Sequence, residues 1–171
     1  MLIGYQRVVI DMLKPAICYA DEIQKKFQEH YYSDDMFLET GSLWNWTPEM
    51  KNDTEYGGHQ YAIVDSKDNV IGYIAFSYDY YSSNARNFGL FSFNRGNILI
   101  GKAVYEVVDM LINKYKAHRI EWRMISGNPV ERHYDKFCDR YNGNKYWLHD
   151  AVKDRQGNYH DDIIYEIIIE R

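Results

Sequence analysis

The spacing of apolar residues predicts three consecutive β-strands in the middle of the chain. Residues 60–65 and 70–77 are rich in β-branched and aromatic residues, and a polar turn at 66–69 separates them. A third such run, 87–93, follows a second turn at 82–86. Because short polar turns connect all three runs, we expect an antiparallel meander.

Two segments carry the spacing of an amphipathic helix. The first follows Pro15, which suits the first turn of a helix because it lacks an N–H donor, and we expect it to end near His30 or Tyr31. The second begins after residue 97 and is the most regular helical pattern in the chain. The apolar faces are Ile17, Ala20, Ile23 and Phe27 in the first helix, and Ile100, Val104, Val107, Val108, Leu111 and Tyr115 in the second.

The remaining elements complete an α+β pattern in one domain, residues 1–171. Residues 33–58 are irregular and predict a loop with one short helix. The other predicted elements are strands at 6–10 and 118–125, a helix at 129–141 that Asn128 and Pro129 start and Gly143 ends, and a terminal hairpin of 145–152 and 159–169. The expected fold is a mixed, mostly antiparallel sheet of six to seven strands flanked by about four helices.

Composition narrows the class of protein. With 171 residues, 46% of them hydrophobic and 26% charged, the chain has the balance of one globular domain. A net charge of −5 argues against nucleic-acid binding, and no run approaches the roughly 18 apolar residues of a membrane span. The two cysteines, Cys18 and Cys138, lie far apart without a CxxC partner, so we expect both to be reduced and buried in a cytoplasmic protein.

The junction of strand, polar loop and helix at residues 88–104 is the most informative feature for function. The strands before and after the main helix should form a parallel pair, and a ligand can enter where such strands splay. Unpaired N–H groups and a positive dipole at a helix start favour a pyrophosphate. Gly101 and Ala103 allow a pyrophosphate to approach the helix closely, and Gly96 and Asn97 allow a tight turn before it. The alternative is that a glycine near a helix start is only part of a turn, which is the more frequent case.

This order of elements resembles the GNAT superfamily of acetyl-CoA-dependent N-acetyltransferases over nearly the whole chain. The run from Ile98 to Ala103 resembles the family's Q/R-x-x-G-x-G/A pyrophosphate motif, in which Gly101 and Ala103 fit. Ile98 stands where the family has glutamine or arginine, and Arg95 or Lys102 could supply the missing charge.

The resemblance implies a set of residues around acetyl-CoA. Backbone groups of residues 91–93 would pair with the pantetheine arm as an added strand does. The implied cofactor-binding residues are Phe91, Ser92, Phe93, Arg95, Gly96, Asn97, Ile98, Ile100, Gly101, Lys102, Ala103 and Asn128.

A second family signature, an asparagine followed by a tyrosine on the next helix, resembles Asn128 and Tyr134. The spacing is one residue short, so either Gly127 takes the place of the asparagine or the helix starts earlier. The resemblance implies that Tyr134 donates a proton to the thiolate of CoA. The alternative is that Tyr134 packs with Phe137 and Tyr141 on the core face of its helix.

The acceptor side carries weaker signals. Asp79 is the first candidate for a general base and Glu39 the second, although either could be a solvated loop carboxylate. The first helix, residues 36–46 and the turn at 79–83 are expected to form the acceptor pocket. Its candidate substrate-binding residues are Glu39, Trp44, Trp46, Tyr80 and Tyr81. No histidine or cysteine spacing indicates a metal or a covalent intermediate.

The sequence therefore favours transfer of an acetyl group from acetyl-CoA to a primary amine of a small molecule or peptide, by direct attack in a ternary complex. Two alternatives stay open at this point. One is a non-catalytic acyl-CoA-binding or interaction module with the same fold, and the other is an unrelated α+β domain without a CoA site. A homodimer through terminal strands is compatible with such folds, but no residue pattern supports it.

Overall fold

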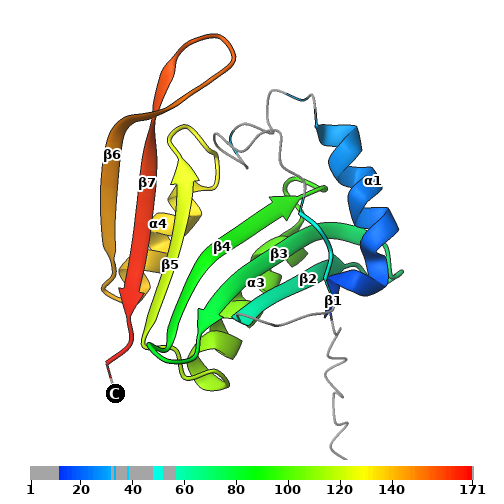
Figure 1. Ribbon diagram of the computed structural model, residues 1–171, viewed down its shortest axis with the longest axis horizontal. Coiled ribbons are helices and arrows are strands. Elements are labelled where there is room, and N and C mark those ends of the chain that lie inside the picture. The colour runs from blue at the N-terminus through cyan, green and yellow to red at the C-terminus, as the bar shows by residue number, and fades with distance from the viewer. Residues whose placement is uncertain (1–11, 32, 34–37, 39–47, 52–56, 171) are drawn as a thin grey trace, which may run out of the picture.

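The computed structural model describes residues 12–31, 33, 38, 48–51 and 57–170 (Figure 1). The predicted strand at 6–10 and most of the loop at 33–58 lie outside these residues. The elements are β1 (Leu13–Pro15), the 3-10 helix η1 (Ala16–Tyr19), α1 (Ala20–His30), β2 (Gly58–Val64), β3 (Val70–Asp79), β4 (Asn84–Ser92), α3 (Ile98–Asn113), β5 (Arg119–Ile125), α4 (Glu131–Arg140), β6 (Asn144–Lys153) and β7 (Tyr159–Ile168).

The seven strands form one sheet in the order β1-β2-β3-β4-β5-β7-β6. Neighbouring strands run antiparallel throughout, except for β4 and β5, which are parallel. The α+β class, the meander of β2, β3 and β4, the parallel pair and the terminal hairpin of β6 and β7 are all as predicted. The parallel arrangement arises because α3 carries the chain from the end of β4 back to the start of β5.

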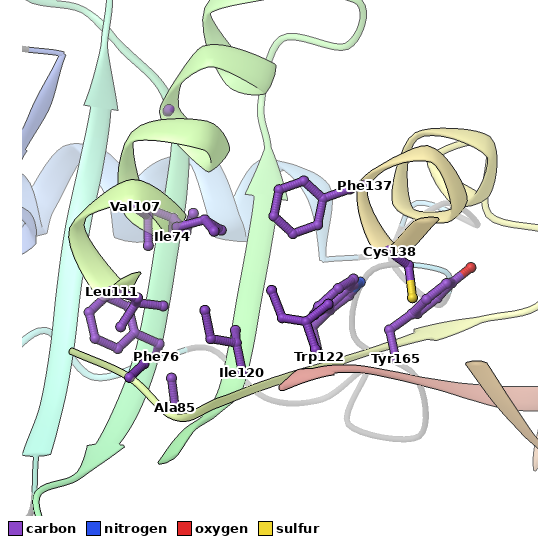
Figure 2. Close-up of a cluster of buried hydrophobic side chains, with 14 of the residues drawn as sticks. Ile74, Phe76, Ala85, Val107, Leu111, Ile120, Trp122, Phe137, Cys138 and Tyr165 are labelled. Atoms are coloured by element: carbon purple, nitrogen blue, oxygen red, sulfur yellow. The ribbon is translucent and has the colours of Figure 1, made fainter. Parts of the chain in front are cut away.

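Alternate residues of the central strands feed two separate cores. Ile63 and Ile74 belong to the core under α3, whereas Ala62 and Tyr73, their neighbours in sequence, belong to the core under α1. Since successive side chains of a strand point to opposite faces, α1 and α3 cover opposite faces of the sheet. Figure 2 shows side chains of α3 lying over those of β3. In the predicted apolar stripe Val107, Val108 and Leu111 are buried, whereas Ile100, Val104 and Tyr115 are partly buried.

Two predicted boundaries are wrong, the start of β4 and the start of the first α-helix. β4 begins at Asn84, inside the predicted turn at 82–86, because the carboxylate of Asp79 closes a shorter turn by accepting a hydrogen bond from Tyr81 N at 2.9 Å. Pro15 ends β1 and precedes η1, and the α-helix starts only at Ala20. The predicted helix end near His30 is confirmed.

The boundaries of α4 also differ from the prediction. Asn128 Oδ1 accepts a hydrogen bond from Val130 N at 3.0 Å, which forms a local turn, and the helix starts afterwards at Glu131. At the other end Asn142 adopts the left-handed conformation, with φ of 50°, and Gly143 N donates to Cys138 O at 2.9 Å. Gly143 follows this left-handed residue. A glycine is needed there because a side chain would have no space.

The two cysteines differ in environment. Cys138 is buried as predicted, whereas Cys18 is exposed, so its predicted burial is wrong. Cys18 lies in η1, a single short turn whose buried residue is Ala16. Burial raises the pKa of the Cys138 thiol, and the nearby carboxylates of Asp139 and Asp135 add to that effect.

Substitution of Gly143 by alanine is expected to destabilise the protein by about 1–3 kcal/mol through overcrowding. An added Cβ would lie 2.5 Å from Glu166 O, 2.6 Å from Cys138 Sγ and 2.7 Å from Ile167 Cγ2. Gly89→Ala is the matched control, because a Cβ there meets nothing within 4 Å. Urea unfolding of both variants tests the prediction, and equal stabilities would contradict it.

Candidate functional site

The parallel strands β4 and β5 separate along their length. They pair from Asn84 opposite Arg119 to Phe88 opposite Trp122, with a shift of register between these two points. Between Ala85 and Phe88, β4 contains one residue more than β5, and Asn87 has a φ of 54°. An extra residue of this kind is a β-bulge, which bends its strand. Beyond Phe88 the two strands diverge, and Figure 1 shows β4 turning away from β5.

The loop after β4 leads directly into the start of α3. Gly96 has a φ of 77°, and Asn97 N donates to Asn94 O at 3.2 Å, which closes a tight turn. Asn97 caps the helix, because its Oδ1 accepts a hydrogen bond from Leu99 N at 3.0 Å. The positive end of the α3 dipole therefore lies at the open end of the β4–β5 pair.

This corner of the molecule is open to solvent. A Cβ built on Gly96 or Gly101 meets no atom within 4 Å, and Lys102 is exposed beside them. Ile98, which stands at the motif position usually held by glutamine or arginine, is 73% exposed. Ala103, in contrast, is fully buried against the sheet, so its small side chain serves packing. The start of α3 thus has the room that a diphosphate requires.

The side chains at the end of β4 anchor the strand to α1. Phe91 and Phe93 pack edge-on against Phe27, with ring centroids 4.7 Å and 5.2 Å away. The hydroxyl of Ser92 is buried and has no hydrogen-bond partner among the described residues. The aromatic side chains fix the position of this backbone, and Ser92 offers an unused polar atom near the loop that precedes α3.

A small pocket lies where α3 and α4 meet the diverging strands. Tyr134, on α4, is half-buried and forms part of its wall. The ring of Tyr134 packs edge-on against Trp122 at 6.0 Å and Tyr165 at 5.9 Å. The lining residues are Phe88, Val104, Val108, Ile120, Trp122, Tyr134 and Phe137. Tyr134 thus packs against the core with Trp122 and Tyr165, and Tyr141 packs on Phe137. The predicted role of Tyr134 as a proton donor stays a prediction.

A polar network holds α4 against β6 and β7. Lys145 Nζ lies 2.7 Å from Asp135 Oδ1 and 2.8 Å from Glu131 Oε1, and Tyr165 Oη donates to Asp135 Oδ1 at 2.8 Å. Burial opposes ionisation of Asp135, but the hydrogen bonds from Lys145 and Tyr165 outweigh it and lower the pKa of this carboxyl. Sequence patterns did not reveal this network, because its members come from three separate elements. It fixes the helix that carries Tyr134.

The side chain of Asn128 is committed to local structure. Besides accepting from Val130 N, it donates through Nδ2 to Leu38 O at 2.9 Å, which ties the turn before α4 to the segment at residue 38. Its predicted role toward the cofactor stays a prediction.

The structure argues against Asp79 as the general base. The residue pairs with Asn84, the first residue of β4, and so lies at the closed end of the parallel pair. Its carboxylate accepts hydrogen bonds from Ser82 Oγ at 2.7 Å and from Tyr81 N at 2.9 Å. These bonds hold the pKa of Asp79 below its ordinary value, which disfavours proton abstraction from an amine.

The predicted acceptor pocket is wrong in its composition. Glu22 of α1 accepts a hydrogen bond from Val70 N at 3.0 Å, so α1 lies at the first residue of β3. The turn at 79–83 follows the last residue of β3, roughly 30 Å away at the rise of an extended strand. The two segments cannot line one pocket. Tyr80 and the fully exposed Tyr81 lie on that distant turn, and Glu39, Trp44 and Trp46 fall outside the described residues.

The described part of the chain contains neither a cluster of metal ligands nor a membrane-spanning helix. No group of three or more His, Cys, Asp or Glu side chains there is placed to hold a metal ion. None of its helices combines the length and the apolar character that crossing a membrane requires.

Comparison with solved structures identifies the fold. The structure matches a probable acetyltransferase at a TM-score of 0.63 and 15% identity, with 92% of this chain and 90% of that chain covered. It matches the spermidine N-acetyltransferase of Vibrio cholerae, solved with CoA and spermine, at a TM-score of 0.65 and 14% identity, covering 86% and 90%. Another structure of the Vibrio cholerae enzyme, with manganese ions, gives a TM-score of 0.55 at 16% identity, covering 86% and 74%.

The chain has the GNAT fold. No protein-family model matches the sequence, and no curated protein matches it. At 14–16% identity the structural likeness establishes the architecture, and the chemistry of the site has to be argued from this chain's own residues.

Substitution of Gly101 by alanine is expected to move stability and ligand binding in opposite directions. The exposed helical position should gain about 0.5–1 kcal/mol of stability, because alanine favours helix more than glycine does. Binding of CoA should weaken by about tenfold, equivalent to about 1.4 kcal/mol, since the methyl group occupies the open space beside the α3 start. Urea unfolding checks the change in stability, and calorimetric titration with CoA checks the change in affinity. An unchanged affinity would contradict the placement of the CoA diphosphate at the start of α3.

Proposed function

We propose that the protein is an N-acetyltransferase that transfers an acetyl group from acetyl-CoA to a primary amine. The observation that carries the proposal is the open end of the β4–β5 pair, with the exposed start of α3 on one side and Tyr134 of α4 on the other. The fold supports it, because structures of the same architecture include acetyltransferases, one of them solved with CoA.

The residues around the α3 start fit a diphosphate. Backbone N–H groups of the first helical turn and the helix dipole attract an anion, and Gly96 and Gly101 leave room for it. Arg95 and Lys102 are exposed at the same corner and add positive charge. The backbone of residues 91–93, anchored by its aromatic side chains, is positioned to pair with an extended arm of the ligand.

The chemistry that acetyl-CoA supplies when bound is an activated thioester carbonyl with a thiolate leaving group. Among the described residues, Tyr134 is our candidate to protonate the departing sulfur, because its ring lines the pocket and the Asp135–Lys145 pair fixes its helix. The Cys138 thiol is an unsuitable nucleophile, since it is buried and its pKa is raised. The proposed route is therefore direct attack by the amine on the thioester carbonyl, with CoA as the leaving group.

The acceptor is proposed to be a cationic amine. The net charge of −5 favours such a partner, and the structural neighbour solved with spermine makes polyamines the first acceptors to test. Glu39, Trp44 and Trp46 are retained as proposed acceptor-side residues, and Glu39 replaces Asp79 as the first candidate base.

A second candidate is a CoA-binding module without turnover. The observation that favours it is Ile98, an exposed apolar residue at the motif position that normally contacts the pyrophosphate. Steady-state release of CoA with a panel of polyamines and other primary amines separates the two functions. Saturable CoA binding without release of CoA from acetyl-CoA by any amine would favour the module.

Replacement of Tyr134 by phenylalanine is expected to lower kcat by about 100-fold or more, because it removes the proton donor but keeps the ring that packs on Trp122 and Tyr165. The KM for acetyl-CoA should change little. Tyr141→Phe, at the carboxyl end of the same helix, is the control and should retain full activity. A Tyr134→Phe variant with the wild-type kcat would rule out the proton-donor role.

A further inference from the structure

Positive charge gathers on the edge of α4 that faces α3. Tyr105 of α3 packs edge-on against Phe137 of α4 at 5.7 Å, and the guanidinium of Arg140 lies over the ring of Tyr105, 5.2 Å from its centroid. Residues four apart on a helix are neighbours, so Lys136 lies along the same edge as Arg140. Both cations are exposed, and neither forms an ion pair with another described residue.

The acidic residues of α4 do not neutralise this edge. Glu131 and Asp135 lie on the other side of the helix, where both bind Lys145 of β6. Asp139, the remaining acid of α4, is exposed and pairs with neither cation. In a chain with a net charge of −5, two adjacent cations without a carboxylate partner stand out from the rest of the surface. Beside an aromatic ring, they suit an anion that carries a flat group.

The helices α3 and α4 begin at the same end of the sheet. α3 returns the chain from the end of β4 to the start of β5. α4 likewise returns it from the end of β5 to the start of β6, which is parallel to β5 because both pair antiparallel with β7. The helices therefore run in the same direction, and Figure 2 shows Phe137 of α4 pointing toward α3. Tyr105 lies one turn beyond Gly101, about 6 Å at the rise of an α-helix.

The part of CoA next to its diphosphate has the matching chemistry. One ribose joins the diphosphate to adenine and carries the 3′-phosphate. Tyr105 is 45% exposed, so its ring offers a surface on which a base can stack. Lysine and arginine bind phosphate through charge-assisted hydrogen bonds. A ligand whose diphosphate lies at the start of α3 reaches Tyr105 and the cations of α4 with this end.

We infer that Lys136 and Arg140 bind the 3′-phosphate of CoA and that the adenine stacks on Tyr105. This inference rests on the proposed function and concerns the end of the ligand remote from the thioester. It makes α4 the element that distinguishes CoA from a ligand without the 3′-phosphate.

Calorimetric titration with CoA and with dephospho-CoA, which lacks only the 3′-phosphate, tests the inference. The wild-type protein should bind CoA about tenfold more tightly than dephospho-CoA. Lys136→Gln and Arg140→Gln should each weaken the binding of CoA by about threefold to tenfold and leave that of dephospho-CoA nearly unchanged. Tyr105→Leu should weaken the binding of both ligands alike, because both contain adenine.

Lys116→Gln is the matched control, because it removes the same charge from an exposed position beyond the carboxyl end of α3. It should leave the ratio of the two affinities unchanged. A purely structural role of Arg140 in packing on Tyr105 would change both affinities in the same proportion. Equal wild-type affinities, or a preference for CoA that survives both α4 substitutions, overturn this inference and leave the proposed function standing. Failure of both ligands to bind the wild-type protein overturns the two together.

Discussion

The extra residue in β4 is the constraint on which the site depends. A bulge bends its strand, and here the bulge around Asn87, with its positive φ, shifts the register just before the last pair, Phe88 and Trp122. Upstream of that point the sheet is continuous and closed. Downstream, the ends of β4 and β5 diverge, and space becomes available between the helices that follow each of them.

The helices α3 and α4 supply the groups on either side of that space. α3 begins immediately after β4, so its positive end and its exposed first turn face the opening. α4 follows β5 and brings Tyr134 to the other side, where the hydrogen bonds of Asp135 with Lys145 and Tyr165 hold the helix in place. The proposed binding and the proposed proton donation therefore depend on separate elements, α3 and α4, which follow the two diverging strands.

The sequence predicted the elements well because their signals are local. Period-two and helical spacings located β2, β3, α3 and the terminal hairpin, and the order of elements indicated the parallel pair. Boundaries were less accurate where a single side chain decides them. Asp79 closes a turn earlier than the segment 82–86 that composition predicts. Asn128 forms a turn of its own, so α4 starts later than predicted. The glycine and asparagine pattern before α3 predicted the tight turn that the structure has there, and its role toward a pyrophosphate stays a prediction.

The site itself was only partly predictable. Tyr134 was singled out by a motif, but its exposure to the pocket depends on packing between α4, β5 and β7. Asp79 was chosen for its place at a strand end, and only the register shows that this is the closed end of the pair.

Hydrogen exchange at the start of α3 tests the central claim most directly. If the divergence of β4 and β5 creates a CoA site, saturating CoA should slow exchange of the backbone amides of residues 96–102 and of the end of β4. The closed end of the sheet, including the turn at 79–83, should be unaffected. Protection confined to another region, or none around α3 when CoA is bound, would contradict the account.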